Sequence, residues 1–210
     1  MQKVDFRREL AVLYRPSASS VSSVDVPPMN FLMVDGAGDP NTTPAYQEAV
    51  EALFSLSYAL KFAIKRGQDQ LDYSVMPLEG LWWSEDMSSF ASGDRSAWLW
   101  TMMIMQPPAV TTELVASTFS AVAAKKPLPG LSRIRFQEFH EGLAAQTLHV
   151  GPFSTEGPTI ERVRDFIDES GRSRFGKHHE IYLSDIRKAQ PERWKTVIRQ
   201  PMRMLTSGST

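Results

Sequence analysis

The chain has 210 residues, of which 42% are hydrophobic and 22% are charged, and its formal net charge at pH 7 is −1. This composition is typical of a folded protein that is long enough to bury a sizeable core without cross-links. Because the chain has no cysteine, disulfides, thiolate metal sites and cysteine nucleophiles are excluded. The near-zero net charge, without a run of like charges, gives no sign of a surface for nucleic acid or for an anionic membrane.

The start of the chain, MQKVDFRRELAVLYRPS, carries charges where a signal peptide would need an apolar core. No uninterrupted apolar run approaches the roughly 20 residues of a membrane span. We therefore expect a soluble, cytoplasmic protein.

Residues 3–15 predict a short helix ended by Pro16, and the Ser- and Pro-rich residues 17–28 predict an extended connector.

The first half of the chain then predicts a strand, a long helix, two strands and a second helix. The strand FLMVDGAGDP (31–40) is closed by glycines, and Thr43-Pro44 provides an N-cap and first helical residue. The long helix has apolar residues at helical spacing and stops at Gly67. The predicted segments are a helix over 46–66, strands over 72–83 and 97–106, and a helix over 111–126.

The second half repeats this order of elements. A strand over 144–153 ends in Gly-Pro, and a helix begins at Gly157-Pro158. Strands over 178–185 and 194–202 follow. Two such βαββ units predict an α+β fold with an antiparallel sheet, helices on one face and a ligand pocket on the other. The expected division is an N-terminal helix and connector (1–28), one domain (29–202) with repeats at about 29–107 and 133–202, and a flexible tail (203–210).

The segment KHHEIYLSD (177–185) places a glutamate at the centre of a predicted strand. Because side chains alternate along a strand, His179 and Ile181 share one face, and Glu180 and Tyr182 share the other. We expect the apolar set to face the helices and Glu180 to lie on the open face. A solvated glutamate paired with an arginine would be the ordinary interpretation. His178 and His179 point in opposite directions, so no metal site is predicted.

Four of the five tryptophans lie in one predicted hairpin, at Trp82, Trp83, Trp98 and Trp100. Alternation prevents Trp82 and Trp83 from entering the same core, so at least one should face the open side. Met103 and its neighbouring methionines add adaptable surface. The hairpin could simply be a large core. Together with a central carboxylate, however, the tryptophan-rich hairpin favours an aromatic pocket for flat, hydrophobic, cationic ligands.

Other candidate motifs point less clearly to chemistry. VDGAGDP lacks the third glycine of the dinucleotide-binding pattern, and no GxSxG nucleophile elbow is present. His140, beside Glu141, is either a structural histidine or part of a polar pocket rim. Tyr58 lies off the main apolar face of the long helix, so its hydroxyl could enter the pocket or join the core. We expect no cofactor.

Several long motifs occur together in the chain, including MNFLMVDGAGDPN, MPLEGLWW, WTMMIMQP, FHEGLAAQTLHVGP and GKHHEIYLSD. Over roughly residues 3–202 this combination resembles the GyrI-like small-molecule-binding family, and in particular its stand-alone branch of cyclopropanoid cyclopropyl hydrolases. The resemblance implies a duplicated βαββ fold. It also implies that Glu180 matches the pocket glutamate that contacts cationic drugs in related multidrug-sensing transcription activators. Those regulators carry a DNA-binding domain before this module, for which about thirty residues leave no room.

The resemblance leaves the function open between binding and catalysis. In the first alternative the protein binds planar, amphipathic, often cationic small molecules and gives multidrug protection. In the second it is a hydrolase that opens the cyclopropane of DNA-alkylating natural products, with Glu180 acting on water and Tyr58 or Tyr182 orienting it. A protein partner such as DNA gyrase is the least favoured reading, and the oligomeric state is not indicated. The expected ligand-binding residues are Trp82, Trp83, Trp100, Met103, His140 and Tyr182.

Overall fold

The computed structural model describes residues 2–68, 70–85 and 95–205. The chain divides into two compact units, and each is described by itself. Unit 1 comprises Met1–Glu9 and Met29–Phe139, and unit 2 comprises Leu10–Pro28 and His140–Thr210. In both units antiparallel strands pack against helices, so the predicted α+β class is confirmed.

The sheet of unit 1 has the strand order β5-β6-β3-β7, and all neighbours are antiparallel. A small parallel pair, β1 with β4, completes the strands of this unit. The bounds are β1 (Gln2–Val4), β3 (Met29–Ala37), β4 (Leu71–Tyr73), β5 (Leu78–Trp83), β6 (Leu99–Gln106) and β7 (Arg135–Phe139). The helices are α1 (Phe6–Glu9), α3 (Pro44–Arg66) and α5 (Thr112–Ala123), with 3₁₀ turns η1 (Arg95–Ala97) and η2 (Leu131–Arg133).

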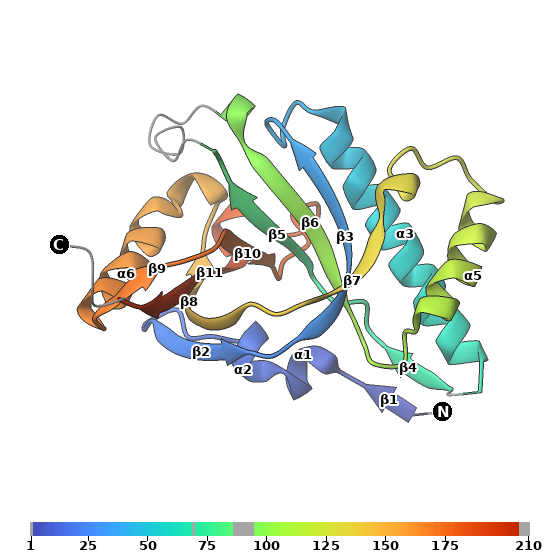
Figure 1. Cartoon of the computed structure of the whole chain (residues 1–210), viewed down its shortest axis with the longest axis horizontal. Coiled ribbons are helices and arrows are strands. Elements are labelled where there is room, and N and C mark those ends of the chain that lie inside the picture. Colours follow the sequence, from blue (N-terminus) through green and yellow to red (C-terminus); the bar gives the residue numbers. More distant parts are fainter. Residues whose placement is uncertain (1, 69, 86–94, 206–210) are drawn as a thin grey trace. The chain divides into compact units, whose positions relative to one another are not determined.

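The long helix α3 covers one face of this sheet, and α5 packs beside it (Figure 1). Pro44 occupies the first helical position after the N-cap Thr43, and the helix ends at Gly67, as the sequence predicts. The buried face of α3 repeats at helical spacing and forms the core of unit 1 against β3 and β6. Its buried residues are Ala49, Ala52, Leu53, Leu56, Ser57, Leu60 and Ile64.

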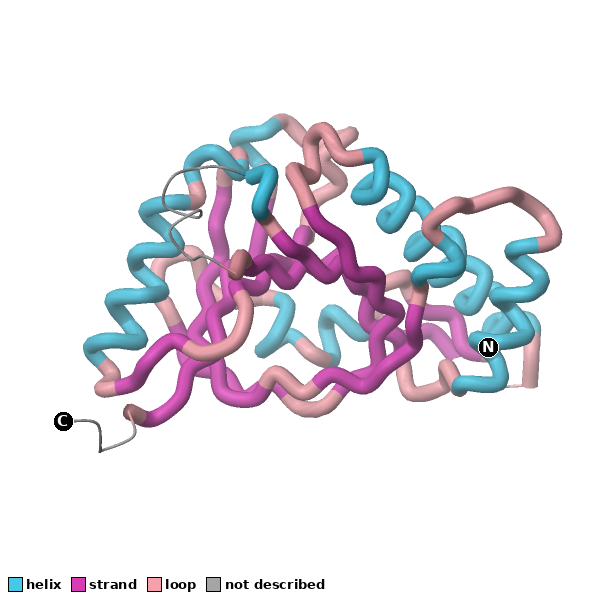
Figure 2. Tube along the Cα trace, turned by 45° about the horizontal axis from the view of Figure 1, so that its top comes forward, coloured by secondary structure: helices cyan, strands magenta, loops and turns pink. Residues whose placement is uncertain are grey.

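The sheet of unit 2 has the strand order β2-β8-β11-β10, again antiparallel throughout, and β9 pairs with the end of β11. The helix α6 packs on β8 and β11 and is the long helix at the left of Figure 1 and Figure 2. The strands are β2 (Ser22–Val26), β8 (Gly142–Val150), β9 (Arg172–Arg174), β10 (His178–Tyr182) and β11 (Lys195–Met204). The helical segments are α2 (Ala11–Tyr14), η3 (Phe153–Thr155), α6 (Gly157–Glu169) and η4 (Pro191–Arg193).

The two units share one internal plan, which confirms the predicted duplication. In unit 1 the repeat runs along the chain as β3, α3, β5 and β6, and its strands lie in the sheet in the order β5-β6-β3. In unit 2 the repeat runs along the chain as β8, α6, β10 and β11, and its strands lie in the corresponding order β10-β11-β8. Each unit also gains one strand beside the first strand of its repeat, β7 beside β3 and β2 beside β8.

The sequence prediction was wrong at the N-terminal segment. Residues 3–15 do not form one helix: β1 precedes α1, and the helix breaks at Leu10, whose backbone angles are non-helical (φ −98°, ψ 36°). The connector 17–28 contains the strand β2. Val24 and Val26 alternate with exposed residues in β2, and this alternation was the signal for a strand that Ser and Pro content obscured.

Candidate functional site

Glu180 lies on the face of unit 2 that carries the helix. It pairs in register with Ile198, and Ile198 packs with Val163 and Ile167 of α6 in the core of this unit. Because directly paired residues of antiparallel strands share a face, Glu180 and Tyr182 point to the α6 side. The prediction that they face away from the helix is therefore wrong.

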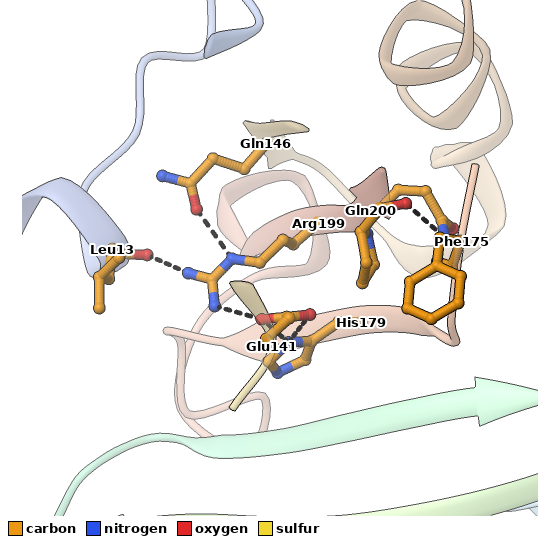
Figure 3. A network of polar contacts seen from close by, with 8 residues as sticks. Leu13, Glu141, Gln146, Phe175, His179, Arg199 and Gln200 are labelled. Carbon is orange, nitrogen blue, oxygen red and sulfur yellow. Dashed lines mark hydrogen bonds and ion pairs between the residues drawn. The ribbon is translucent and has the colours of Figure 1, made fainter. Parts of the chain in front are cut away.

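The opposite face of the same sheet is also covered, which explains the wrong assignment. Arg199 donates hydrogen bonds to the backbone oxygen of Leu13, to Gln146 Oε1 and to Glu141 Oε2, at 2.7, 2.9 and 3.1 Å (Figure 3). Glu141 also accepts a hydrogen bond from His179 Nδ1 at 2.9 Å. A sheet covered on both faces shows no simple alternation of apolar and polar residues, so alternation could not identify the helix side.

The Glu180 carboxylate is held by two neighbours on its own strand. His178 Nε2 donates to Oε1 at 3.1 Å, and the Tyr182 hydroxyl donates to Oε2 at 2.8 Å. The Glu180 side chain is 16% exposed. Burial alone would raise its pKa, but the hydrogen bonds from His178 and Tyr182 and the charges of His178 and His179 bring the pKa of Glu180 below its usual value. The predicted sharing of one face by Glu180 and Tyr182 is confirmed, and His178 lies on the same face.

A second carboxyl group, Glu156, lies close to this one, and the sequence analysis missed it. Glu156 is the N-cap residue of α6 and is 5% exposed. Burial, followed by repulsion from Glu180, raises its pKa to about 8, although a hydrogen bond with Thr196 acts in the other direction. The pKa values of the two carboxyl groups are thus shifted in opposite directions, which favours an ionised Glu180 and a neutral Glu156 at neutral pH. A split of this kind is the usual arrangement for an acid and a base in one active site.

Aromatic side chains of unit 2 border this pair of carboxyl groups. The ring of Phe153 meets the ring of Tyr182 edge to face, with centroids 5.7 Å apart, and lies 5.1 Å from that of Trp194. Trp194 is fixed by a hydrogen bond from its indole N–H to the backbone oxygen of Ala189. Phe153 remains 37% exposed, so it offers an apolar surface beside Tyr182. The sequence analysis did not single out Phe153 or Trp194.

Two of the predicted tryptophans lie on the helix face of unit 1. The ring of Tyr46 in α3 stacks on Trp82, with centroids 6.1 Å apart, and meets Trp100 edge to face at 5.4 Å. Trp82 and Trp100 are paired in register, and both are almost completely buried. A role for Trp82 and Trp100 in ligand binding remains a prediction.

Trp83 and Met103 point to the other face of the unit 1 sheet by strand alternation. Met103 is fully buried and pairs in register with Glu79, which is also fully buried. Trp82 and Trp83 therefore do lie on opposite faces, as predicted. A role for Trp83 and Met103 in ligand binding stays a prediction.

Tyr58 and His140 are the two remaining predicted residues. Tyr58 is 48% exposed on α3 and stacks against Phe54. His140 is exposed and lies just before β8. Tyr182, not Tyr58, is the tyrosine with a hydrogen bond to Glu180. A catalytic role for Tyr58 and a binding role for His140 remain predictions.

Within residues 2–68, 70–85 and 95–205, no group of three or more His, Asp or Glu side chains is placed to hold a metal ion. Over the same part of the chain, no helix is both long enough and apolar enough to cross a membrane.

Comparison with known proteins identifies the family. The model of the GyrI-like small-molecule-binding domain matches residues 19–203. A conserved protein from Listeria innocua, described as uncharacterized, is 42% identical in sequence, with a TM-score of 0.88 over 95% of this chain and 100% of its own. A hydrolase from Listeria innocua is 40% identical, with a TM-score of 0.83 over 95% of this chain and 100% of its own.

At greater distance, the C-terminal domain of EcmrR shares the fold at 12% identity, with a TM-score of 0.53 over 89% of this chain and 98% of that domain. A search of curated proteins found no match. The match of the family model over most of the chain, together with the duplicated βαββ units, shows that this protein belongs to the GyrI-like small-molecule-binding family.

Proposed function

We propose that this protein is a small-molecule hydrolase in which Glu180 acts as a general base on water. The observation that carries the proposal is the partly buried Glu180 carboxylate, which accepts hydrogen bonds from Tyr182 and His178. Its lowered pKa keeps it ionised at neutral pH and ready to accept a proton. A hydrolase that is 40% identical to nearly the whole chain supports the same class of reaction.

A base with a lowered pKa is weak, so the substrate has to supply part of the driving force. A cyclopropane conjugated to a carbonyl group, as in cyclopropanoid DNA-alkylating compounds, stores that energy as ring strain. The water oxygen would bond to the ring CH₂ while a ring carbon–carbon bond breaks. The electron pair moves to the carbonyl oxygen, which becomes a phenolate, and Glu180 takes the proton of the water. The phenolate then takes up one proton to become a phenol, and Glu180 releases its proton. The net change is the addition of one water molecule.

Product analysis in ¹⁸O-labelled water tests this proposal. We expect wild-type protein to convert a cyclopropanoid into its ring-opened alcohol with one ¹⁸O, and Glu180→Gln to lose about 100-fold or more in rate. Glu161→Gln is a matched control, because Glu161 lies on α6 of the same unit with its side chain 60% exposed and paired with Arg164. Absence of labelled alcohol with wild-type protein would refute the proposal.

A second candidate function is binding of planar cations without turnover. The observation that favours it is that an ionised carboxylate, Glu180, lies beside the aromatic rings of Tyr182 and Phe153. Fluorescence anisotropy with rhodamine 6G, and with a neutral aromatic of similar size as control, tests it. A loss of more than about tenfold in affinity for the cation in Glu180→Gln, roughly 1.4 kcal/mol, would support this role. Equal binding by both proteins would exclude it.

A further inference from the structure

Glu156 occupies an unusual position for a glutamate at the start of a helix. A glutamate near a helix N-terminus is normally solvated, where it is stabilised by the helix dipole. Glu156 is 5% exposed, and its Oε1 atom is buried without a hydrogen-bond partner among the residues that the structure describes. A buried carboxyl oxygen without a partner is costly to maintain, so it calls for an explanation.

Two groups of unit 2 act on the carboxyl group of Glu156, and His149 contacts residues close to Glu156 in the chain. From β11, Thr196 hydrogen-bonds to its carboxyl group, and from β10, the charge of Glu180 acts on it. From β8, His149 Nδ1 is 2.9 Å from Thr159 Oγ1 of α6. The other ring nitrogen of His149 is 3.3 Å from Thr155 Oγ1, which precedes Glu156. His149 therefore has hydroxyl partners at both ring nitrogens, and none of these contacts pairs Glu156 with a cation.

Thr196 lies between the two carboxyl groups in the hydrogen-bonding pattern, because it bonds to Glu156 and is paired with the residue that bonds to Glu180. It pairs in register with Tyr182, so both side chains lie on the α6 face of the sheet. Tyr182 donates to Glu180, and Thr196 bonds to Glu156. Phe153, in the turn just before Glu156, packs on the Tyr182 ring. One end of α6 and the middle of β10 thus present an acid and a base to the same region of unit 2.

We propose that Glu156 is the general acid of the reaction, the group that gives its proton to the substrate's carbonyl oxygen as the cyclopropane opens. This inference rests on the proposed hydrolase function. Glu180 receives the proton of the attacking water, and Glu156 supplies the proton of the new phenol. The ring carbon–carbon bond breaks and the bond from the water oxygen to CH₂ forms. Afterwards Glu180 is neutral and Glu156 is ionised.

The same pair then returns to its starting state without an external acid. After ring opening the proton is on Glu180, whose pKa is lowered. Glu156, whose pKa is raised to about 8, has lost its proton. Proton transfer from Glu180 to Glu156 is therefore downhill, either directly or through water. Because the charge of Glu180 acts on Glu156, the protonation of the two carboxyl groups has to be followed for the pair together.

The pH dependence of turnover tests the inference. We expect the kcat/KM of the wild type to fall above about pH 8, as Glu156 loses its proton. In Glu156→Gln, which keeps the size but has no acidic proton, the rate should fall about 100-fold and the decline at high pH should disappear. Glu156→Asp should recover part of the rate. Thermal unfolding of each variant shows whether it is folded.

A readout without substrate tests the protonation state directly. The ¹³C chemical shift of the labelled Glu156 carboxyl group should be that of a neutral acid at pH 7 in wild type. In Glu180→Gln the pH at which this group titrates should be lower, because the repulsion from Glu180 is gone. An ionised Glu156 at pH 7 would overturn the inference. So would an unchanged rate and pH profile in Glu156→Gln while wild type opens the ring. If the wild type opens no ring at all, the hydrolase proposal itself fails, whatever the carboxyl titration shows.

Discussion

Tyr182 and Glu180 lie two residues apart on β10, and the Tyr182 hydroxyl donates a 2.8 Å hydrogen bond to Glu180 Oε2. The spacing places both side chains on the α6 face of the sheet. The bond stabilises the ionised form of Glu180 and fixes one of its two oxygens, so that the carboxylate has a defined direction. Residue spacing on a single strand is thus enough to build the core of the site.

Replacing Tyr182 with Phe removes this donor and leaves the ring. We expect the pKa of Glu180 to rise, so the decline of kcat/KM at low pH should move to higher pH. The loss of a hydrogen bond to a charged group should cost about tenfold in rate at neutral pH. A pH–rate profile of ring opening measures both effects.

Tyr58→Phe is the matched control for that variant, because Tyr58 is half exposed on α3. If Tyr182 is the tyrosine that orients the water, Tyr58→Phe should retain the wild-type rate. A larger loss in Tyr58→Phe than in Tyr182→Phe would instead assign the role to Tyr58.

The buried network of Glu141, Arg199 and His179 should dominate the stability of unit 2 (Figure 3). The side chains of all three are 1% exposed. Removing one charge leaves the others buried without compensation, so Glu141→Gln should lower the free energy of unfolding by about 3–5 kcal/mol. Urea unfolding at pH 7 measures this, and Glu161→Gln, on the surface of α6, should change it by less than about 0.5 kcal/mol.

The same network predicts a loss of stability in acid. Burial opposes ionisation of Glu141, but the charges of His179 and Arg199 and their hydrogen bonds outweigh it and lower the pKa of Glu141 to about 2 from the ordinary 4.5. A lowered folded-state pKa means that this stabilisation is complete above about pH 4.5 and is lost as the pH falls toward 2. Unfolding free energies measured from pH 6 to 3 should fall in wild type and fall less in Glu141→Gln.

Gly36 is needed because Trp100 packs against its backbone. A Cβ atom at this position would overlap the six-membered ring of Trp100, which is fully buried. Gly36→Ala should therefore destabilise the protein by about 1–3 kcal/mol through overpacking. Gly157→Ala is the control: nothing lies within 4 Å of its added Cβ, so the melting temperature should stay the same or rise slightly. Equal melting temperatures for both variants would contradict the packing described.

The sequence predicted the repeated elements well, because their boundaries carry strong local signals. The start of α3 at Pro44 and its end at Gly67 follow from residue types that act within one turn of helix. The strand β2 was missed because Ser and Pro content obscured its alternation, and both β2 and β7 lie outside the repeated order of elements. Their pairing with β8 and β3 is a long-range contact that no local pattern encodes.

The site was predicted only in part, for a similar reason. Glu180 and Tyr182 were found because a carboxylate inside a strand is unusual. Glu156 was missed because a glutamate beside the start of a helix is ordinary in sequence, and only its burial against β11 makes it unusual. The face of Glu180 was assigned wrongly because Arg199 and Glu141 bury charge on the side opposite α6.

The most direct test of Glu180 as the base is its effect on a single turnover. Enzyme in excess over a cyclopropanoid substrate at pH 7 gives the rate of ring opening without interference from product release. We predict rapid opening by wild type, a rate lower by about 100-fold or more in Glu180→Gln, and a wild-type rate in Glu161→Gln. Ring opening by Glu180→Gln at the wild-type rate would contradict the assignment.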